Sequence, residues 1–191
     1  ALPLHSALTD LDPHWQNAPW RSLDYDLGAH IRTANMLPTP GQLDWVDVAR
    51  QLSARTNLVA IVAAATALGT ITDVQLAAER AHAAGALVFV DAVHYAPHQV
   101  VDVREMDCDF LSCSAYKFYG PHIGILYGRH DLLAALDVPK LLPSPNEAPE
   151  RMETGTQNHE GIAGAPAALE FLASLAPVAS RRPSLLEVFP V

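Results

Sequence analysis

The sequence predicts an α/β fold with a mostly parallel sheet between helices, and three neighbouring segments carry this prediction. Residues 58–65 form a continuous apolar run of strand length, as a strand buried on both faces requires. Residues 73–84 have helical character and are followed by Gly85, which is suited to end a helix. Residues 88–91 form a second apolar run that ends in Asp91. Strand, helix and strand in this order predict a βαβ unit with a right-handed crossover.

The segment before this unit is expected to supply two more strands and a helix. Its first part contains Pro13 and Pro19, so we predict a loop rather than a helix there. Its last part carries apolar side chains at close to helical spacing, which predicts a helix. The expected order is a strand at 1–9, a loop at 10–20, a strand at 23–31 and a helix at 43–53.

The segment after the βαβ unit predicts two more strands, followed by helices and loops. Residues 110–117 form an apolar strand that ends in Lys117, and a glycine-punctuated turn leads to a strand at 124–127. Pro166 is expected near the first turn of the last helix. The remaining elements are a helix at 131–136, a proline-rich loop at 138–150, a polar turn at 153–161 and a small-residue helix at 162–175.

The composition of the 191-residue chain argues against several function classes. The chain has 12 Lys and Arg against 21 Asp and Glu, a formal net charge of -9, and no basic cluster, which argues against a nucleic-acid or anionic-membrane surface. It contains no apolar run long enough to cross a membrane. The two cysteines, Cys108 and Cys113, lie inside or beside the expected strand at 110–117. We therefore expect inert packing thiols and a reducing cytosolic setting rather than a disulfide scaffold.

Two residues at expected strand ends indicate a cofactor site. An acid such as Asp91, at the carboxyl end of a parallel strand, lies where α/β sheets bind ligands. Its carboxylate could keep a pyridine nitrogen protonated and so make the ring an electron sink. Burial of Lys117 would favour its neutral amine, which forms Schiff bases. Together the two residues predict pyridoxal 5'-phosphate (PLP) chemistry, whereas the structural alternatives are a turn-capping aspartate and a surface lysine.

Four further residues, three near these strand ends and one in the loop predicted at 10–20, could contact the same ligand. Ser114 and Tyr116 could donate hydrogen bonds to a phosphate, and His94 could reach a ligand hydroxyl. His14 could stack on a flat ring or move a proton. Each of these residues, taken alone, also has an ordinary structural interpretation.

A further phosphate contact is expected in a turn before the last helix. Gly155 and Thr156 lie in this turn, whose backbone N–H groups could bind phosphate, although Gly-Thr turns are common. The histidines at 98, 122 and 159 are interpreted as structural or peripheral. No HExxH, CxxC or comparable spacing predicts a metal site.

Four motifs, in their order and spacing, resemble the class V aminotransferase family of PLP enzymes, specifically its cysteine desulfurase-like branch. They are DPHWQNAPW at 12–20, VDAVHYAPH at 90–98, DFLSCSAYKFYGPHIGILYG at 109–128 and ETGTQNHEGIAG at 153–164. The resemblance implies the three-layer large domain of fold-type I PLP-dependent transferases at 1–175, incomplete at its N-terminus. It also implies that the small C-terminal domain is absent and that residues 176–191 form a tail that does not match.

The resemblance assigns roles to individual residues. It implies that Lys117 forms the Schiff base with PLP and that Asp91 pairs with the pyridine nitrogen. Thr66 stands where the family places an asparagine that touches the cofactor. The other implied contacts are His14 on the ring and in proton transfer, His94 beside the phenolic oxygen, Ser114 and Tyr116 on the phosphate, and Gly155 and Thr156 on the phosphate of the partner subunit.

The activity implied by the resemblance is PLP-dependent removal of sulfur from cysteine, in a homodimer that passes the sulfur to an acceptor protein. Selenocysteine lyase, epimerase and aminotransferase reactions of the same family are alternatives. The family's upstream phosphate loop, catalytic cysteine and substrate-binding arginine lie outside the matching motifs. A catalytically silent remnant of the family is therefore the alternative of a different class. A Rossmann dehydrogenase is disfavoured because no GxGxxG follows a predicted strand.

Overall fold

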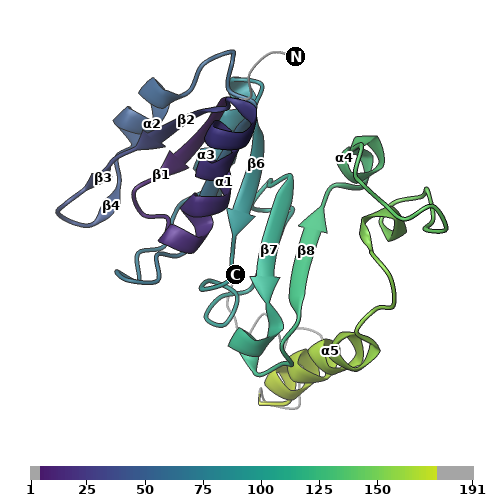
Figure 1. Cartoon of the computed structure of the whole chain (residues 1–191). Coiled ribbons are helices and arrows are strands. Elements are labelled where there is room, and N and C mark those ends of the chain that lie inside the picture. Colours follow the sequence, from purple (N-terminus) through teal and green to yellow (C-terminus); the bar gives the residue numbers. More distant parts are fainter. Residues whose placement is uncertain (1–4, 176–191) are drawn as a thin grey trace. The chain divides into compact units, whose positions relative to one another are not determined.

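The computed structural model describes residues 5–175, so the tail predicted at 176–191 and the first four residues of the strand predicted at 1–9 lie outside the described residues. The chain divides into two compact units, Ala1–Ser112 and Cys113–Val191, called unit 1 and unit 2 here. Figure 1 follows the chain through both units from purple to yellow.

Unit 1 is built on a parallel sheet whose strands have the spatial order β2-β1-β5-β6-β7. Because neighbouring strands are parallel, their carboxyl ends lie at one edge of the sheet. The register places Val62 opposite Asp91, and Asp91 opposite Ser112. The strands are β1 His5–Thr9, β2 His30–Ala34, β5 Leu58–Val62, β6 Leu87–Asp91 and β7 Phe110–Ser114, the last of which continues into unit 2.

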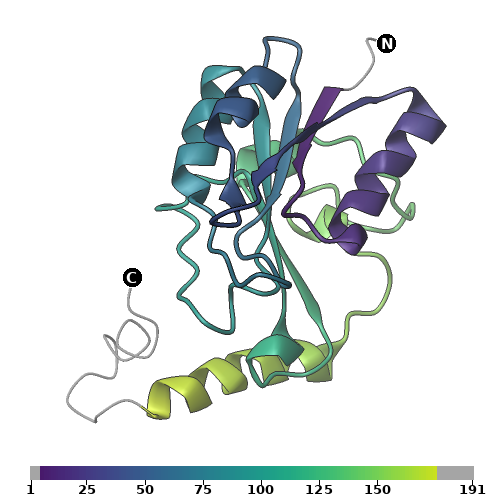
Figure 2. The same ribbon diagram turned by 90° about the vertical axis from the view of Figure 1, so that its left-hand side faces the viewer.

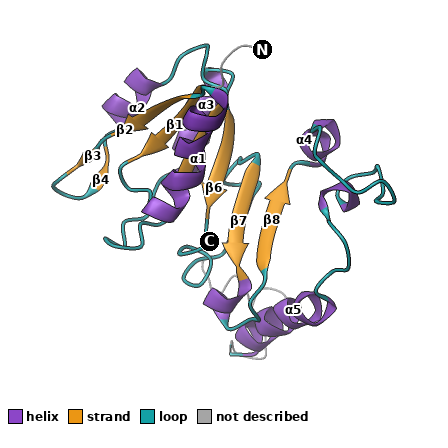
Figure 3. Cartoon of the chain, in the orientation of Figure 1, coloured by secondary structure: helices purple, strands orange, loops and turns teal. Residues whose placement is uncertain are grey.

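Three helices cover the two faces of this sheet. They are α1 His14–Leu27, α2 Trp45–Gln51 and α3 Val74–Ala83. Figure 2 shows α1, in purple, on one face and α2 and α3, in blue and teal, on the other, and Figure 3 shows the strands in orange between them. Ala77, Ala78 and Ala81 of α3 are buried, and their small side chains let the helix pack closely on the sheet. A short antiparallel pair, β3 Met36–Leu37 and β4 Gln42–Leu43, precedes α2.

Unit 2 begins with the end of β7 and continues through a short 3-10 turn. Its elements are η1 Ala115–Phe118, β8 Gly124–Gly128, α4 His130–Ala135, η2 Glu150–Met152 and α5 His159–Ser174. Strand β8 is hydrogen-bonded to β7, and the backbone N of Ala115 donates to the carbonyl oxygen of Ile123 at 3.0 Å. Figure 1 shows α5 beside η1. Between these elements, the described residues of unit 2 form irregular connections.

The predicted α/β fold class and the βαβ unit are confirmed. Strand β5, helix α3 and strand β6 occupy the expected segments, and β5 and β6 pair in parallel. The carboxylate of Asp73 accepts a hydrogen bond from the backbone N of Leu76 at 2.9 Å and so caps the start of α3. Gly85 follows the end of α3 with a φ of 81°, a backbone conformation that glycine adopts without strain.

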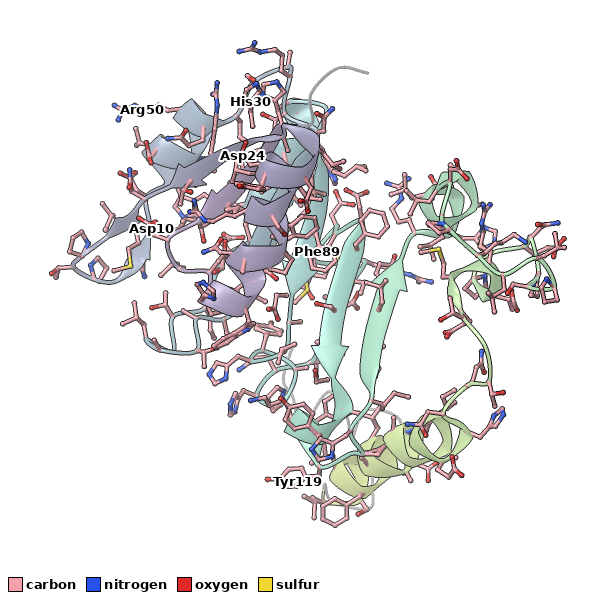
Figure 4. The ribbon with its side chains drawn as sticks, viewed as in Figure 1. Asp10, Asp24, His30, Arg50, Phe89 and Tyr119 are labelled. Carbon is pink, nitrogen blue, oxygen red and sulfur yellow. The ribbon has the colours of Figure 1, made fainter. Side chains whose placement is uncertain are left out.

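The loop predicted at 10–20 and the strand predicted at 23–31 are wrong. Helix α1 runs through both segments, with Pro19 inside it, and β2 begins only at His30. The parallel pairing of β1 with β2 explains this result, because parallel neighbours need a long crossover connection. Packing also favours the helix: the ring of Trp20 meets the ring of Phe89, labelled in Figure 4, edge-on at 5.3 Å. These tertiary contacts outweigh the single backbone donor that Pro19 lacks.

Three predictions in unit 2 are wrong in detail. The strand predicted at 110–117 ends at Ser114, and Lys117 lies on η1 instead. Helix α5 begins at His159, earlier than predicted, because the side chain of Asn158 caps it through the backbone N of Gly161 at 2.9 Å. Pro166 is therefore an interior residue of α5 rather than part of its first turn.

Over residues 5–175, no helix has both the length and the apolar character that membrane crossing requires.

Candidate functional site

Several predicted site residues lie at the edge of the unit 1 sheet where the strands have their carboxyl ends. His14 begins the helix that follows β1, Thr66 lies in the turn after β5, and Asp91 and His94 lie at and after the end of β6. Ligands of open α/β sheets bind outside the carboxyl ends of the strands. The fold of unit 1 therefore places these four residues at or beyond the strand ends, on the edge where a ligand is expected.

Asp91 is a buried carboxylate with a fixed orientation. Its side chain is 6% exposed, and its Oδ1 accepts a hydrogen bond from the backbone N of Val93 at 2.8 Å. Its backbone is held on the neighbouring strand, because the N of Ala63 donates to the carbonyl oxygen of Asp91 at 2.9 Å. Burial raises the pKa of Asp91, and no cationic side chain of residues 5–175 forms an ion pair with it. A cationic nitrogen on a bound ligand would supply the missing counter-charge.

Asp12 is a second buried carboxylate at this edge, and the sequence interpretation missed it. Its Oδ2 accepts from the backbone N of Thr9 at 2.6 Å, and its Oδ1 accepts from the backbone N of Val62 at 2.8 Å. These bonds tie together the ends of β1 and β5. Burial raises the pKa of Asp12 to about 7, the two backbone hydrogen bonds lower it, and the negative charge of Asp91 raises it further. The signal that could have identified Asp12 is its place in the short connection between β1 and α1, close to a strand end, as Asp91 is.

The first turn of α1 carries His14 and two unsatisfied polar atoms. His14 is exposed at the start of the helix. The side-chain nitrogen of Asn17 donates to the carbonyl oxygen of Asp12 at 2.9 Å, which joins this turn to the buried carboxylate. The Nε2 of Gln16 and the Oδ1 of Asn17 are buried without a hydrogen-bond partner among the described residues. Buried polar atoms are almost always paired, so these two atoms indicate a place for a ligand or ordered water.

His94 and Thr66 lie near these strand ends without a described contact to either carboxylate. His94 is half-buried, and its ring lies edge-on to the ring of His98 with centroids 5.3 Å apart. Thr66 is exposed in a turn that closes with a hydrogen bond of 2.8 Å from the backbone N of Gly69 to the carbonyl oxygen of Ala65. The expected contacts of both residues with a cofactor therefore stay predictions.

Tyr116 and Lys117 lie together on the η1 turn of unit 2. Ser114, half-buried, directly precedes the turn. The ring of Tyr116 stacks on the ring of His122 with centroids 5.0 Å apart, and the Nζ of Lys117 lies 5.3 Å from the centroid of Tyr116. The expected burial of Lys117 is wrong, because its side chain is exposed on the turn. The chain leaves the strand after Ser114, so Lys117 is not flanked by strand neighbours.

Close packing defines the turn that carries Lys117. A Cβ atom on Gly120 would lie 2.8 Å from the carbonyl oxygen of Ala115, so only glycine fits at this position. The backbone N of Gly120 donates to that same oxygen at 2.8 Å, and Tyr119 has a φ of 66°. Helix α5 packs on the turn at Gly164, where a Cβ atom would lie 3.1 Å from the ring of Pro121. The backbone around Lys117 is thus held from both sides.

Gly155 and Thr156 line a separate cavity in unit 2. Its volume is about 520 Å³, and its other lining residues include Ser144, Gln157 and His159. Gly155 has a φ of 77°, which suits glycine. The cavity is also lined by Glu150 and Glu153, whose charge opposes a phosphate. The phosphate contact expected here stays a prediction, and it would need cations from elsewhere to offset these two carboxylates.

Cys108 does not have the properties of a reactive thiol. Its side chain is buried, and burial raises the pKa of Cys108 to about 11, so that its thiol is protonated at neutral pH. This agrees with its expected packing role. In the described part of the chain, no group of three or more His, Cys, Asp or Glu side chains is arranged to hold a metal ion.

Known proteins match the sequence of both units. The model of the family described as "Aminotransferase class-V" matches residues 5–184. A cysteine desulfurase of Yersinia pseudotuberculosis serotype O:1b (strain IP 31758) is 35% identical over 181 residues, covering 88% of this chain and 44% of that protein. A cysteine desulfurase of Pectobacterium atrosepticum is 34% identical with the same coverage. The chain therefore spans less than half the length of these curated relatives.

Solved structures that are similar to this chain also include cysteine desulfurases. The crystal structure of a cysteine desulfurase from Escherichia coli has a TM-score of 0.81 and 29% identity, covering 90% of this chain and 46% of that one. The apo structure of a cysteine desulfurase from Thermococcus onnurineus NA1 has a TM-score of 0.81 and 27% identity, covering 96% of this chain and 47% of that one.

Proposed function

The chain belongs to the class V aminotransferase family, and on this premise we propose that it forms most of the PLP-binding large domain of a cysteine desulfurase-like enzyme. The names of the curated relatives support cysteine as the substrate and its sulfur as the transferred group. Because the chain covers 44% of the first of these relatives, the reaction belongs to the proposal for the whole enzyme. Lyase, epimerase and aminotransferase reactions of the family are the other outcomes that a substrate assay would distinguish.

The observation that carries the proposal is the state of Asp91. A carboxylate that is 6% exposed, with one backbone hydrogen bond and no counter-ion among residues 5–175, is costly when charged. The protonated pyridine nitrogen of PLP would relieve this cost, so the residue fits the cofactor. When bound, PLP supplies an electron-withdrawing ring that stabilises negative charge on an attached amino acid. Asp91 would keep the ring nitrogen protonated by remaining ionised beside it.

We assign covalent attachment of the cofactor to Lys117. Its place in the motif SAYKFYG supports this role, and the tightly packed turn around Gly120 holds its backbone. With its exposed Nζ, Lys117 would also move the proton at the α carbon of the substrate. The chain has only one other lysine, Lys140, which donates to the carbonyl oxygen of Ser144 at 2.9 Å and lies outside the matching motifs.

The remaining contacts divide between the ring and the phosphate. His14, at the start of α1, would stack on the ring and assist proton transfer, and His94 would lie beside the phenolic oxygen. Thr66 would offer a hydroxyl where the family has an asparagine. Ser114 and Tyr116 would hold the phosphate through their hydroxyl groups. Gly155 and Thr156 would reach the phosphate bound by the partner subunit of a homodimer.

The proposal also covers the binding partners of the enzyme and its cellular compartment. The partners would be a second copy of the chain, a small amino-acid substrate and a protein that accepts the sulfur. The net charge of -9 gives no support to a nucleic-acid partner. A reducing cytosolic compartment is supported by the small number of cysteines and by the buried thiol of Cys108.

The direct test is covalent trapping of the cofactor. The purified chain is incubated with PLP, reduced with borohydride and digested, and the modified peptide is identified by mass spectrometry. We expect a visible absorbance band before reduction and a stable pyridoxyl group on Lys117 afterwards. Lys117→Ala should lose both signals, whereas the matched control Lys140→Ala should retain both. A modification shared equally by the two lysines would show non-specific labelling and refute the assignment.

Sulfide release separates the enzyme from the silent remnant. Release from cysteine well above the Lys117→Ala background would support the desulfurase reaction. Trapping on Lys117 without sulfide release would support the cofactor site and favour the remnant for this chain. A longer protein that includes this chain would then be assayed with cysteine, selenocysteine and other amino acids to identify the substrate.

A further inference from the structure

A cavity at the edge of unit 1 far from the carboxyl strand ends holds a group of basic side chains. It has a volume of about 410 Å³ and is lined by His5, Asp24, His30, Ile31, Arg32 and Arg55. His5 and His30 are the first residues of β1 and β2 and are opposite one another in the parallel register. The cavity therefore lies at the amino-terminal ends of these strands, whereas Asp91 ends β6 at the other edge.

We propose that this cavity, which we call the basic cleft, is a binding site for a small dianion that carries a phosphoryl group. Four potentially cationic side chains line it against a single acid, Asp24. Figure 4 labels His30 and Asp24 at the same end of unit 1. This charge balance is opposite to that of the whole chain, whose formal net charge is -9. The proposal concerns a site separate from the proposed cofactor site and does not depend on it.

The two arginines of the basic cleft retain donors for a ligand. A side-chain nitrogen of Arg32 donates to the carbonyl oxygen of Gln51 at 3.3 Å, which holds the guanidinium in place and leaves its other N–H groups available. Neither Arg32 nor Arg55 forms an ion pair with a carboxylate anywhere in the range 5–175. A guanidinium presents a planar fork of donors that matches phosphate oxygens in a two-bond geometry.

The two histidines of the basic cleft are held close together. Their ring centroids are 4.8 Å apart, and the backbone N of His5 donates to the side chain of Asn57 at 3.0 Å. Burial lowers the pKa of His5, and the positive charges of His30, Arg55 and Arg32 lower it further. An anion in the cleft would offset this repulsion and favour the protonated rings.

The dimensions of the cleft limit the ligand to a small molecule. A volume of about 410 Å³ lies in the lower part of the range of small-molecule sites. Two arginines and two histidines can balance a dianion, and Asp24 can accept a hydrogen bond from a hydroxyl group. Inorganic phosphate and a small phosphate monoester share this chemistry. An ester that binds more tightly than inorganic phosphate would identify a phosphorylated metabolite as the natural ligand, and the reverse order would identify free phosphate.

Phosphate titration at constant ionic strength tests the proposal. The histidine ring resonances of the full chain are followed by NMR as chloride is replaced by inorganic phosphate or glycerol phosphate. We expect saturable shifts of the His5 and His30 signals. Arg55→Gln should weaken binding by about tenfold or more, because it removes a charged hydrogen-bond donor. The matched control Arg50→Gln replaces an exposed arginine of α2 outside the cleft and should change the affinity less than about twofold.

Two further variants separate this site from the proposed cofactor site. Ser114→Ala and Lys117→Ala should leave phosphate binding at the basic cleft unchanged. Binding that disappears in these variants but persists in Arg55→Gln would overturn the proposal by locating the phosphate elsewhere. Equal weakening by Arg50→Gln and Arg55→Gln, or equal shifts with chloride, would also overturn it as general charge screening. Circular dichroism of each variant verifies that it is folded.

A dianion whose charge does not change near neutral pH gives a last check. Sulfate should bind more tightly at about pH 6 than at about pH 8, because protonated histidine rings favour the anion. The titratable and charged groups that line the cleft with His5 are His30, Arg32, Arg55 and Asp24. His5→Gln should reduce the pH dependence, and an unchanged dependence in this variant would contradict the role given to the His5 ring.

Discussion

Asp91 in unit 1 and Lys117 in unit 2 are positioned by two different kinds of structure. Asp91 ends a central strand, is buried, and has its backbone and its carboxylate held by neighbouring N–H groups. Lys117 is exposed on a 3-10 turn, and its ammonium group faces the ring of Tyr116 at 5.3 Å. The sheet determines the place of the acid, whereas the packing of a glycine determines the place of the lysine. The two residues should therefore respond to different substitutions.

The largest expected effect comes from neutralising the acid. Asp91→Asn keeps the shape of the side chain but removes the charge that would hold a pyridine nitrogen protonated. We expect PLP to be trapped on Lys117 still, while sulfide release by the whole enzyme falls by about 10²–10⁴-fold. Trapping and steady-state rates on the same preparation measure the two effects. Unchanged rates in Asp91→Asn would contradict the role of this carboxylate.

The next effect concerns Asp12 and the stability of unit 1. Burial raises the pKa of Asp12 to about 7, so its contribution to stability is present below its ordinary pKa and is lost as the pH rises to about 7. We expect this contribution to the free energy of unfolding to fall by roughly 1–4 kcal/mol over that range. Asp12→Asn should remove this dependence. Denaturant unfolding at several pH values measures it.

Asp10 offers a matched control for this experiment. It is exposed, is labelled in Figure 4, and lies two residues before Asp12 in the chain. Asp10→Asn should keep the pH dependence of the unmodified chain. A pH profile in which Asp12→Asn and the unmodified chain coincide would show that Asp12 does not bind a proton in this range.

A smaller effect is expected from the turn that carries Lys117. In Gly120→Ala, the new Cβ atom would lie 2.8 Å from the carbonyl oxygen of Ala115, so the backbone must shift. We expect a loss of about 1–3 kcal/mol in stability and slower trapping of PLP on Lys117. In the control Gly124→Ala, the Cβ atom would have no neighbour within 4 Å, and both values should change little. Equal behaviour of the two variants would contradict the close packing described at Gly120.

The smallest effect is expected at Thr66. The side chain is exposed, so Thr66→Asn should change stability by less than about 0.5 kcal/mol. An asparagine would restore the residue type that the family resemblance places there. We expect PLP to bind up to about tenfold more tightly, as one added hydrogen bond allows. Spectrophotometric titration measures the affinity, and weaker binding by Thr66→Asn would count against a contact at this position.

The sequence was sufficient to predict the elements that local pattern determines. The apolar run of β5, the capped helix α3 and the acid at the end of β6 were all predicted because each depends on neighbouring residues. Helix α1 was mispredicted because Pro19 dominates the local pattern, whereas the parallel pairing of β1 with β2 requires the helix. Asp12 was missed because its importance depends on Val62, which is distant in sequence.

The site residues predicted from the motifs depend on both kinds of information. Motif spacing predicted Asp91 and Lys117 as site residues, but it could not show that the strand ends at Ser114 and that Lys117 lies on an exposed turn. That outcome depends on the contact between Gly120 and Ala115, which only the folded backbone reveals. The residues that line the basic cleft are likewise spread along the sequence from His5 to Arg55, so no local motif predicts the cleft.

The hydrogen bond from Val62 to Asp12 also has a consequence for the order in which contacts form during folding. It joins residues 50 positions apart, whereas β5, α3 and β6 are close in sequence. Contacts between distant residues carry a larger loop-closure entropy than local ones. The carboxylate of Asp12 should therefore engage the end of β5 late, after the transition state. In stopped-flow experiments, we expect Asp12→Asn to accelerate unfolding while leaving the refolding rate nearly unchanged.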